Sequence, residues 1–379
     1  MQIGTMKEAH VHSDTTVTIH DVPIPQITHP SQILVKVVVS GTNPKDWKMP
    51  ASMLKTISHC PNSGDDVAGF VHAIGTNVTD FHIGDRVAAL HELGTPGGSY
   101  AEYSLVWDWT TFHLGNHVSF EEAATVPMAA LMASIGIFGM LELAAGPWAP
   151  VPTDSEKPLV VYGAASAVGA YAVKLAKLIN VHPLICVAGK GIPFVKTLLS
   201  EGDTIIDYRE GNESVVEEMR KALKGNDLKY AFDATSEHGS YNNLSQVLAG
   251  KGKLTLVLPF PEILKDIPPH IEQSTTMAGS LWKQLSKDQS RDNKALGKLG
   301  VENGGKEFGL MFTKLIATWL NEGKLQPHPY EVVEGGLHGV EIALKALRGG
   351  KVSAMKYIIR IADTPDLRIE KKSPKIVFS

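Results

Sequence analysis

Pro158-Leu-Val-Val-Tyr-Gly-Ala-Ala-Ser-Ala-Val-Gly169 is the stretch of sequence that decides the fold of this chain. Its four apolar residues at 159–162 predict a β-strand, and only small residues follow them up to the valine before Gly169. Apolar residues then recur at helical spacing, which predicts a helix over 168–180. A strand, a tight turn and a helix N-terminus together offer backbone N–H groups to a phosphate. The residues expected beside a bound pyrophosphate are Ala165, Ser166, Ala167 and Val168.

The turn departs from the common Gly-x-Gly-x-x-Gly fingerprint, because Ala164 and Ser166 replace its first two glycines. Taken alone, it also fits a strand and a helix that merely pack closely. The next apolar run, 183–188, predicts the second strand of a βαβ unit, whose end should meet the adenosine ribose. An NAD site has Asp or Glu there, whereas this chain has Gly189 and Lys190. A lysine suits a 2′-phosphate, so NADPH is the expected cofactor, with a solvated loop as the alternative role of Lys190.

Length and composition indicate a folded protein of two domains. The chain has 379 residues, of which 43% are hydrophobic and 20% charged. A net charge of -4 without a basic cluster argues against nucleic acid or anionic lipid as partners. The first ten residues lack the apolar core of a signal peptide, so we expect a cytoplasmic protein. The two cysteines cannot form a four-thiolate zinc site or a disulfide framework.

One uncharged segment, 123–141, approaches the length of a membrane span. It contains Pro127, Ser134, two glycines and many alanines, and glutamates stand at its edges. We therefore expect a buried helix and no membrane association.

Two regions differ in their patterns. In residues 1–126, strand-like runs separated by turns at 16–20, 32–39, 67–71 and 86–90 predict a β domain. From 127 to about 260, strands alternate with helices, which predicts the doubly wound parallel sheet of a Rossmann α/β domain. The alternating segments are 159–163, 168–180, 184–188, 193–200, 204–208, 214–224, 229–233, 240–249 and 253–258. Periodicity weakens at about 260–305, which indicates an insertion near the site, with a linker as the alternative. Helices at 308–321 and 337–347 and a strand at 356–361 follow.

Several motifs precede the Rossmann region in a fixed order. They are Asn43-Pro44-Lys45-Asp46-Trp47-Lys48, Gly64-Asp65-Asp66-Val-Ala-Gly69, Gly75-Thr-Asn-Val78 followed by Gly84-Asp85-Arg86, and Gly97-Gly98-Ser-Tyr100-Ala-Glu-Tyr103. With the strand-turn-helix they resemble the medium-chain dehydrogenase/reductase superfamily from near the first residue to about Ile361. The resemblance implies a GroES-like (chaperonin-10-like) β domain made of 1–126 and 307–379. It also implies a Rossmann domain of 127–306 and an active site in the cleft between the two.

The branch of the superfamily is indicated by zinc ligands that this sequence lacks. Zinc-bearing alcohol dehydrogenases of the superfamily have a Cys where this chain has Thr42 or Asn43, and Gly-His-Glu where it has Gly64-Asp65-Asp66. The sequence therefore resembles the zinc-free members, which are quinone oxidoreductases and enoyl reductases, and we expect no metal. Asp66 and Asp85 are expected to accept local backbone N–H bonds in turns.

Further segments resemble the fungal ToxD-like group, which includes trans-acting enoyl reductases of polyketide assembly lines. These segments are 228–233, 259–261, 328–336 and 350–357. The resemblance allows a polyketide synthase as partner. Some trans-acting members have lost the Val-Gly that ends the turn, so the intact Val168-Gly169 favours a free-standing reductase. The oligomer expected from zinc-free relatives is a monomer or a homodimer.

The expected chemistry is hydride transfer from NADPH to the β carbon of an enone or unsaturated acyl substrate, followed by protonation of the α carbon. By resemblance, Asn43, Lys45, Asp46 and Trp47 lie near the nicotinamide, and Lys48 is the candidate catalytic residue that polarises or protonates the substrate. The alternative is that Asp46 and Lys48 form a loop salt bridge or a solvated pair. Alternative functions are NADPH quinone reduction and a non-catalytic NADPH-binding partner or sensor.

The remaining site residues follow from the same resemblance. Tyr208 is expected to bind the 2′-phosphate with Lys190, and a strand-end tyrosine that caps the sheet is its alternative. The other expected cofactor-binding residues are Gly189, Val257, Leu258, Ser353 and Ala354. The residues expected to line the substrate pocket are Ala129, Met132, Ala133 and Gly136, for each of which core packing is the alternative.

Overall fold

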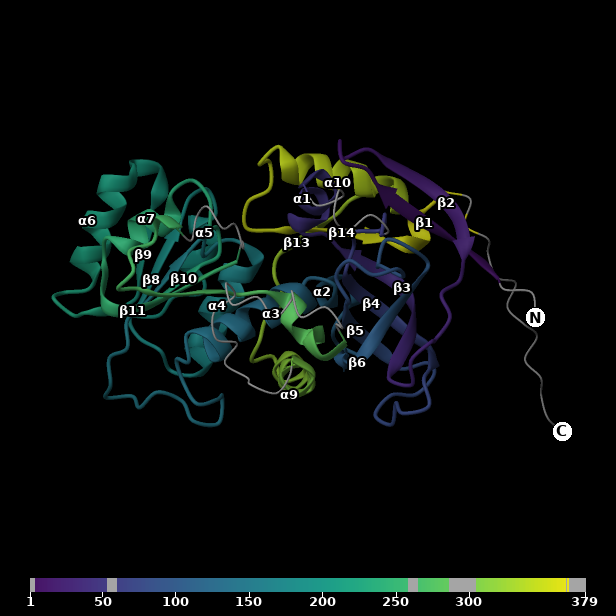
Figure 1. The fold of residues 1–379 in the computed structure, drawn as a ribbon, viewed down its shortest axis with the longest axis horizontal. Helices are drawn as coiled ribbons and strands as arrows, with labels where there is room; N and C mark the ends of the chain where they lie inside the picture. The colour runs from purple at the N-terminus through teal and green to yellow at the C-terminus, as the bar shows by residue number, and fades with distance from the viewer. Residues whose placement is uncertain (1–3, 53–59, 258–264, 286–304, 366, 368–379) are drawn as a thin grey trace.

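A parallel six-stranded sheet forms one half of the molecule in the computed structural model, which describes residues 4–52, 60–257, 265–285, 305–365 and 367 (Figure 1). Its order is β12-β11-β10-β7-β8-β9, and every pairing between neighbours is parallel. The strands are β7 (Leu159–Tyr162), β8 (Leu184–Ala188), β9 (Thr204–Asp207), β10 (Leu228–Asp233), β11 (Leu248–Leu256) and β12 (Glu272–Thr275). The chain moves outward from β7 to β9, then returns to β10 beside β7. The predicted doubly wound Rossmann fold is confirmed, and its switch point lies between β7 and β10.

Helices cover both faces of this sheet because its strands are apolar on both sides. Leu159 and Val161 of β7 join the core cluster that includes Tyr171 and Leu175 of α4 (Ala167–Leu178). The alternate residue Val160 joins the cluster formed with α6 (Asn212–Ala222) and α7 (Ser240–Ser245). Two short helices, α5 (Ile192–Lys196) and η2 (Tyr208–Glu210), follow β8 and β9. A strand buried on both faces is typical of parallel sheets.

The other half is a β domain that the chain enters twice. Its sheet has the order β13-β14-β3-β4-β5-β6, and β6 also pairs with β3, so that β3 to β6 close on themselves. The strands are β3 (Gln32–Gly41), β4 (Asp66–Ile74), β5 (Arg86–His91), β6 (Tyr103–His113), β13 (Tyr330–Val332) and β14 (Lys356–Arg360). A separate hairpin joins β1 (Thr5–Val11) to β2 (Val17–Pro23). In Figure 1 the yellow C-terminal strands lie beside the purple and blue N-terminal ones. The boundaries at 126 and 306 stay predictions.

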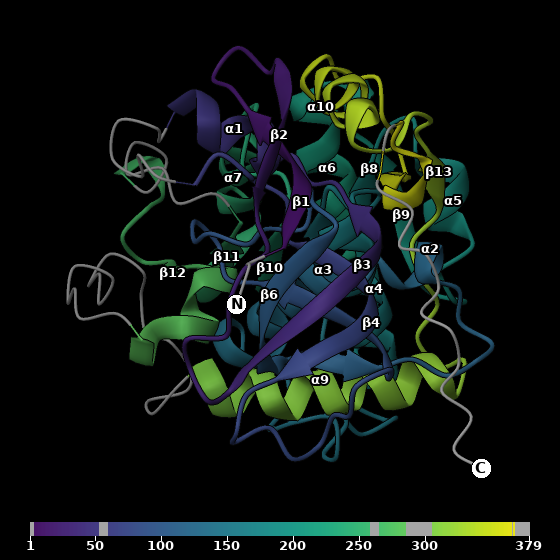
Figure 2. The same cartoon turned by 90° about the vertical axis from the view of Figure 1, so that its right-hand side faces the viewer.

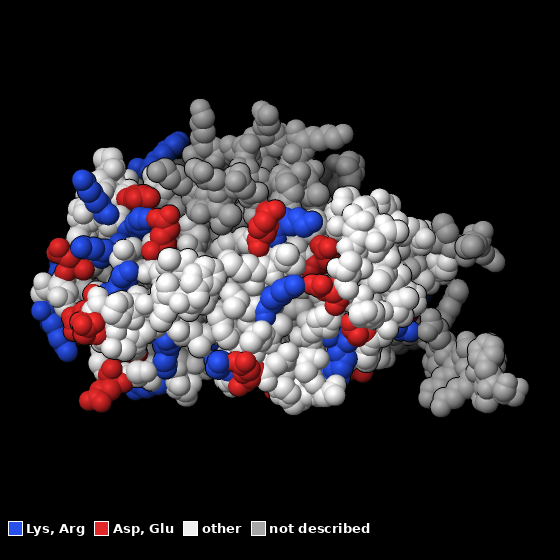
Figure 3. Space-filling model, turned by 90° about the horizontal axis from the view of Figure 1, so that it is seen from below, with Lys and Arg blue, Asp and Glu red and all other residues white. Residues whose placement is uncertain are grey.

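The helices of the β domain and its C-terminal return complete the fold. They are α1 (Lys45–Ser52), η6 (Gly336–His338), α10 (Gly339–Arg348) and η7 (Ile361–Asp363). A longer helix, α9 (Gly305–Asn321), packs against β6 and runs below the β-sheet in Figure 2. Seen from below, lysine and arginine side chains are interspersed with aspartate and glutamate over the described residues (Figure 3).

A buried helical connection leads from the β domain into the Rossmann domain. It consists of α2 (Phe120–Ala123), α3 (Pro127–Ser134) and the π-helical turn η1 (Ile135–Met140). Among the described residues, one helical stretch, Phe120–Met140, is long and apolar enough to span a membrane, and it is almost entirely buried inside the protein. The expected burial of this segment is confirmed.

The region predicted as an insertion contains a strand that the sequence did not predict. Within its described part, 265–285, β12 forms the edge of the Rossmann sheet and is followed by the 3₁₀ helix η3 (Ala278–Leu285). The four residues of β12 are Glu-Gln-Ser-Thr, which are too few and too polar to show a strand pattern. The rest of the predicted insertion, 258–264 and 286–304, lies outside the described residues.

Candidate active site

The turn between β7 and α4 requires its two glycines. Gly163 has a φ of +77°, and a Cβ placed there would lie 2.3 Å from Oγ1 of Thr235. A Cβ on Gly169 would lie 2.3 Å from the carbonyl oxygen of Gly163. Helix and strand therefore approach so closely that neither position accepts a side chain. This tight turn is the geometry predicted from the sequence.

The N-terminus of α4 offers free donors beside this turn. Ser166 is the N-cap, and its Oγ accepts the N–H of Gly169 at 3.0 Å. Among the residues that the structure describes, no acceptor lies within hydrogen-bond distance of the N–H groups of Ala165, Ala167 and Val168. Unpaired N–H groups at the positive end of a 12-residue helix fit a pyrophosphate. The site therefore fits the dinucleotide that the fold implies.

Predicted cofactor residues from distant segments meet around this turn. A Cβ on Gly191 would lie 2.4 Å from Cβ of Ala165, 3.0 Å from Cβ of Ala354 and 3.4 Å from Oγ of Ser353. The segment before β14 thus reaches the dinucleotide turn from the β domain. The structure brings Ala165, Ser353 and Ala354 together, as a shared binding surface requires.

The predicted adenosine end lies after β8 and β9. A Cβ on Gly189 would lie 2.5 Å from Cζ of Tyr208, so the tyrosine ring covers this glycine. Tyr208 is 48% exposed and Lys190 is exposed, so both can reach a ligand. Arg209 adds a further cation, which forms an ion pair with Asp207 at 2.5 Å. Binding of a 2′-phosphate by Lys190 and Tyr208 remains a prediction.

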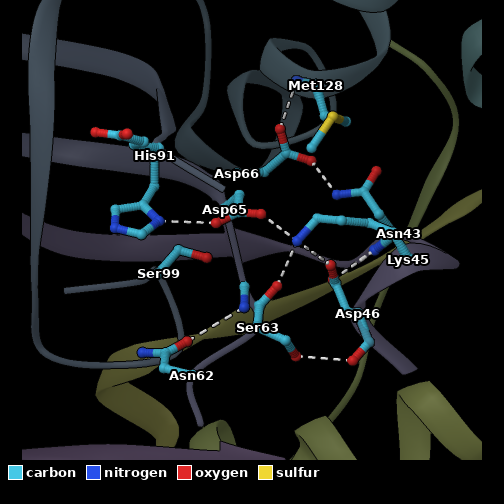
Figure 4. Close-up of polar contacts among 12 residues, drawn as sticks. Asn43, Lys45, Asp46, Asn62, Ser63, Asp65, Asp66, His91, Ser99 and Met128 are labelled. Carbon is cyan, nitrogen blue, oxygen red and sulfur yellow. Dashed lines mark hydrogen bonds and ion pairs between the residues drawn. The ribbon is translucent and has the colours of Figure 1, made fainter. Parts of the chain in front are cut away.

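The segment that begins at Asn43 forms a buried polar network (Figure 4). The Lys45 ammonium lies 2.8 Å from Oδ1 of Asp46, contacts the Asp65 carboxylate and donates to the Ser63 carbonyl at 2.5 Å. Asp65 also bonds Nδ1 of His91 at 2.7 Å. Burial alone would lower the pKa of Lys45, but the two carboxylates outweigh burial and hold this pKa above its ordinary value.

The structure therefore places the Lys45 ammonium against Asp65. Asp65 stands at the position where zinc-bearing alcohol dehydrogenases have a histidine. Among the described residues, no three His, Cys, Asp or Glu side chains are grouped so that they could hold a metal ion.

The second oxygen of Asp46 accepts the backbone N–H of Asn43 at 2.8 Å and the Tyr100 hydroxyl at 2.6 Å. Burial raises the pKa of Asp46 to about 6, although Lys45 opposes the shift.

Asp66 occupies a second network beside the first. Its carboxylate accepts the side-chain amide of Asn43 and the backbone N–H of Met128, each at 2.7 Å, and forms an ion pair with Lys356. Lys356 also donates to Oδ1 of Asn43 at 3.0 Å. The expectation that Asp66 accepts local N–H bonds is wrong, because its partners come from three distant segments. Asp85 does accept a local N–H, from His82 at 2.8 Å.

Lys48 reaches across to the Rossmann domain. Its Nζ lies 2.8 Å from Oε1 of Glu237, in the loop after β10. The alternative of a Lys48–Asp46 pair is wrong, because Lys45 takes that carboxylate. The ring of Trp47 lies 5.6 Å from the Lys48 ammonium and 5.7 Å from the Arg348 guanidinium. Lys48 thus links α1 to the loop that follows β10.

The residues predicted for the substrate pocket lie in the core around α3 and η1. Ala129 and Ala133 are fully buried, Met132 is 9% exposed, and a Cβ on Gly136 would lie 2.2 Å from the Phe232 ring. Their role as pocket lining stays a prediction. The N–H of Val257 donates to Oγ of Ser236 at 3.0 Å. Leu258 lies outside the described residues.

Another buried lysine, Lys174, lies in α4. Lys174 of α4 donates to the carbonyls of Gln326 and Pro327, and burial lowers its pKa to about 8. Burial, followed by repulsion from Lys174 and Lys356, lowers the pKa of His328 to about 3. His328 is therefore a buried neutral imidazole at neutral pH.

Sequence reasoning missed several residues that organise this site. Glu237, Tyr100 and Lys356 were not singled out as site residues, although each pairs with one that was. Glu237 could have been found, because ligand sites of doubly wound sheets lie beyond the strand ends at the switch point. The partners Met128 and Lys356 of Asp66 gave no such signal, since they are far apart in the chain and meet only in the tertiary fold.

Comparison with known proteins shows the family of the chain. Residues 29–116 match the alcohol dehydrogenase GroES-like domain. The trans-enoyl reductase fsr4 of Gibberella fujikuroi is 43% identical over 339 residues, which cover 89% of this chain and 93% of that protein. The fold is similar to that of the quinone oxidoreductase from Coxiella burnetii, with a TM-score of 0.69, 20% identity and coverage of 94% and 99%. It is also similar to the CurK enoyl reductase, with a TM-score of 0.67, 17% identity and coverage of 94% and 98%. The chain therefore belongs to the zinc-free medium-chain dehydrogenase/reductases, in the group of the trans-enoyl reductases.

Proposed function

We propose that this enoyl reductase uses NADPH to reduce the double bond of an α,β-unsaturated carbonyl compound in secondary metabolism. Membership of the trans-enoyl reductase group supports the reaction. The observation that favours this site most strongly is the Lys48 ammonium, which reaches from α1 to the loop beyond β10, next to the turn with free N–H groups. A fixed cation beside a dinucleotide site suits a reaction in which charge develops on a carbonyl oxygen.

We assign the following roles to residues of the site. Ala165, Ala167 and Val168 would hold the pyrophosphate through their N–H groups, and bound NADPH would supply the hydride. Lys48 would donate a hydrogen bond to the carbonyl oxygen of the substrate and stabilise the enolate. The buried Lys45–Asp46–Asp65 network would fix the start of α1, and with it the backbone that carries Lys48.

NADPH rather than NADH is proposed as the cofactor. Gly189 at the end of β8 leaves room for the Tyr208 ring, and the neighbouring Lys190 is exposed. A lysine and a phenol give a 2′-phosphate charge-assisted hydrogen bonds. Asp207, the carboxylate at the end of β9, already forms an ion pair with Arg209.

The test is NADPH oxidation by the purified protein with a panel of enones and unsaturated thioesters, followed by analysis of the products. We expect saturated carbonyl products. Lys48→Ala should lower kcat by about 100- to 1,000-fold, the usual effect of losing one donor to an oxyanion, with little change in NADPH affinity. Lys314→Ala is the matched control, because Lys314 forms an ion pair of similar length with Asp80, 2.7 Å, on the surface. An unchanged kcat of Lys48→Ala would remove this lysine from the mechanism.

We also propose that the acyl substrate is delivered by a polyketide synthase in the cytoplasm. The name of the relatives, trans-enoyl reductase, supports action on a chain carried by a separate protein. Substrates bound to an acyl carrier domain should then give a higher kcat/KM than the same acyl group on a small thiol. Equal values would favour the free-standing reductase. Light scattering of the purified protein distinguishes the monomer from the homodimer.

A further inference from the structure

We propose that Glu237 is the positioning residue for Lys48, and that its carboxylate holds the lysine ammonium beyond the carboxyl ends of β7 and β10. The two side chains come from different domains, and Nζ and Oε1 are 2.8 Å apart. The inference rests on the proposed function, because it gives Lys48 a partner in the same reaction.

The loop that carries Glu237 is built around one buried carboxylate. Asp233, the last residue of β10, is fully buried and accepts the N–H groups of Thr235 at 3.0 Å and Ser236 at 2.7 Å. Its second oxygen accepts the hydroxyl of Ser240, the first residue of α7, at 2.6 Å. Both ends of the loop are therefore tied to the same side chain, which limits how far Glu237 can move.

The backbone on both sides of Glu237 is strained. Ser236 has a φ of 52° and His238 a φ of 56°, although neither residue is a glycine. Left-handed conformations of such residues persist only where surrounding contacts enforce them, and they gather at functional sites. The hydrogen bonds to Asp233 are contacts of that kind. The loop keeps an unfavourable backbone geometry, and the residue at its centre is the one that meets Lys48.

The same loop touches the cofactor turn and the strand next to it. A Cβ on Gly163 would lie 2.3 Å from Oγ1 of Thr235, and Oγ of Ser236 accepts the N–H of Val257 at 3.0 Å. Gly163 follows β7 and Val257 follows β11, so the loop spans the carboxyl edge of three neighbouring strands. Ligands of doubly wound sheets bind at this edge, at the switch point. Glu237 thus stands between the expected cofactor and the other domain.

The pair is too exposed to act mainly as a clamp between domains. The side chains of Lys48 and Glu237 are 21% and 41% exposed, and ion pairs in such surroundings add little to stability. A lysine side chain has many rotamers, however. If Glu237 holds Lys48 in one rotamer before the substrate binds, less side-chain entropy is lost in reaching the transition state. Positioning is therefore the role that this geometry suits.

The experiment is a double-mutant cycle on Lys48 and Glu237 with the full-length protein, NADPH and an enone. We expect Glu237→Gln to lower kcat about tenfold, with the dissociation constant of NADPH and the melting temperature unchanged, and Glu237→Asp to recover part of the loss. In a Lys48→Ala background, Glu237→Gln should have no further effect. Asp80→Asn, which breaks the surface pair with Lys314, is the control and should leave kcat unchanged.

The outcomes separate the two proposals. A wild-type protein that reduces no enone would overturn the proposed function and this inference with it. An active wild type whose Glu237→Gln variant keeps its kcat would overturn the inference alone. So would an equal loss of kcat in the presence and absence of Lys48, because Glu237 would then act independently of the lysine.

Discussion

Lys356→Met removes the cation from the buried pair with Asp66. Lys356 is 3% exposed and Asp66 is not exposed at all, so water cannot replace the missing charge. The carboxylate keeps two partners, the side-chain amide of Asn43 and the N–H of Met128. Asp66 would then be a buried, partly compensated anion at the junction of β4, α3 and β14.

Breaking a buried ion pair on one side typically costs about 3–5 kcal/mol. The two remaining hydrogen bonds to Asp66 put the expected loss at the lower end, about 3 kcal/mol. For a unit of about 150–250 residues, each kcal/mol lowers the melting temperature by roughly 2–4 °C, so we expect a decrease of roughly 6–12 °C. The double variant Asp66→Asn/Lys356→Met should regain at least half of the loss, because it leaves no unpaired charge.

The assay is thermal unfolding followed by far-ultraviolet circular dichroism for both variants. Lys345→Met is the matched control, because Lys345 forms an exposed pair with Glu341 on α10, and it should cost no more than about 0.5 kcal/mol. A melting temperature of Lys356→Met within about 2 °C of the wild type would refute the reasoning. A double variant less stable than the single one would also refute it.

Three further predictions concern the cofactor site and the core behind it. Gly169→Ala places a methyl group 2.3 Å from the Gly163 carbonyl oxygen, so NADPH affinity should fall by about tenfold or more in a fluorescence titration, and an unchanged affinity would contradict the assignment of the turn. Lys190→Ala with Tyr208→Phe should shift the ratio of kcat/KM for NADPH over NADH by roughly 10- to 150-fold, the effect of about 1.5–3 kcal/mol of charge-assisted bonding, whereas a retained preference would exclude this pair. The pKa of His328 is lowered to about 3, so the folded state binds fewer protons than the unfolded state below the ordinary histidine pKa, and stability is lost as the pH falls. Relative to His328→Phe, the wild type should lose about 1.4 kcal/mol per pH unit below about pH 6 in urea unfolding, and parallel pH curves would disprove this.

The Rossmann half could be predicted from the sequence because its signals are local. The predicted strand at 184–188 agrees with β8, and the predicted helix at 168–180 differs from α4 by one or two residues at its ends. Buried parallel strands are continuous apolar runs, and each is followed by a helix with its own period. Two strands are exceptions. β11 begins at Leu248, so the predicted helix at 240–249 is wrong in its last residues. β12 consists of four polar residues. It is a strand because it pairs with β11, and the sequence pattern of β12 alone does not predict this pairing.

The site was less predictable, because its partners are far apart in the chain. Lys48 could be proposed from its motif, but Glu237 lies 189 residues away and was not identified. The motif also suggested Asp46 as the partner of Lys48, and the structure gives that carboxylate to Lys45. Neighbours in sequence compete for one carboxylate, and the backbone geometry of α1 decides which lysine reaches it. That geometry is a property of the tertiary fold.

The return of the chain to the β domain limits how the protein can be divided. β14 pairs with β3, and Lys356 at its start provides the cation for Asp66 in β4. A fragment that stops before α3 would expose one edge of β3 and leave a buried carboxylate without its counter-ion. Expression of the N-terminal 126 residues by themselves should therefore yield aggregated material, whereas a fusion that appends the last strands through a short linker should remain folded.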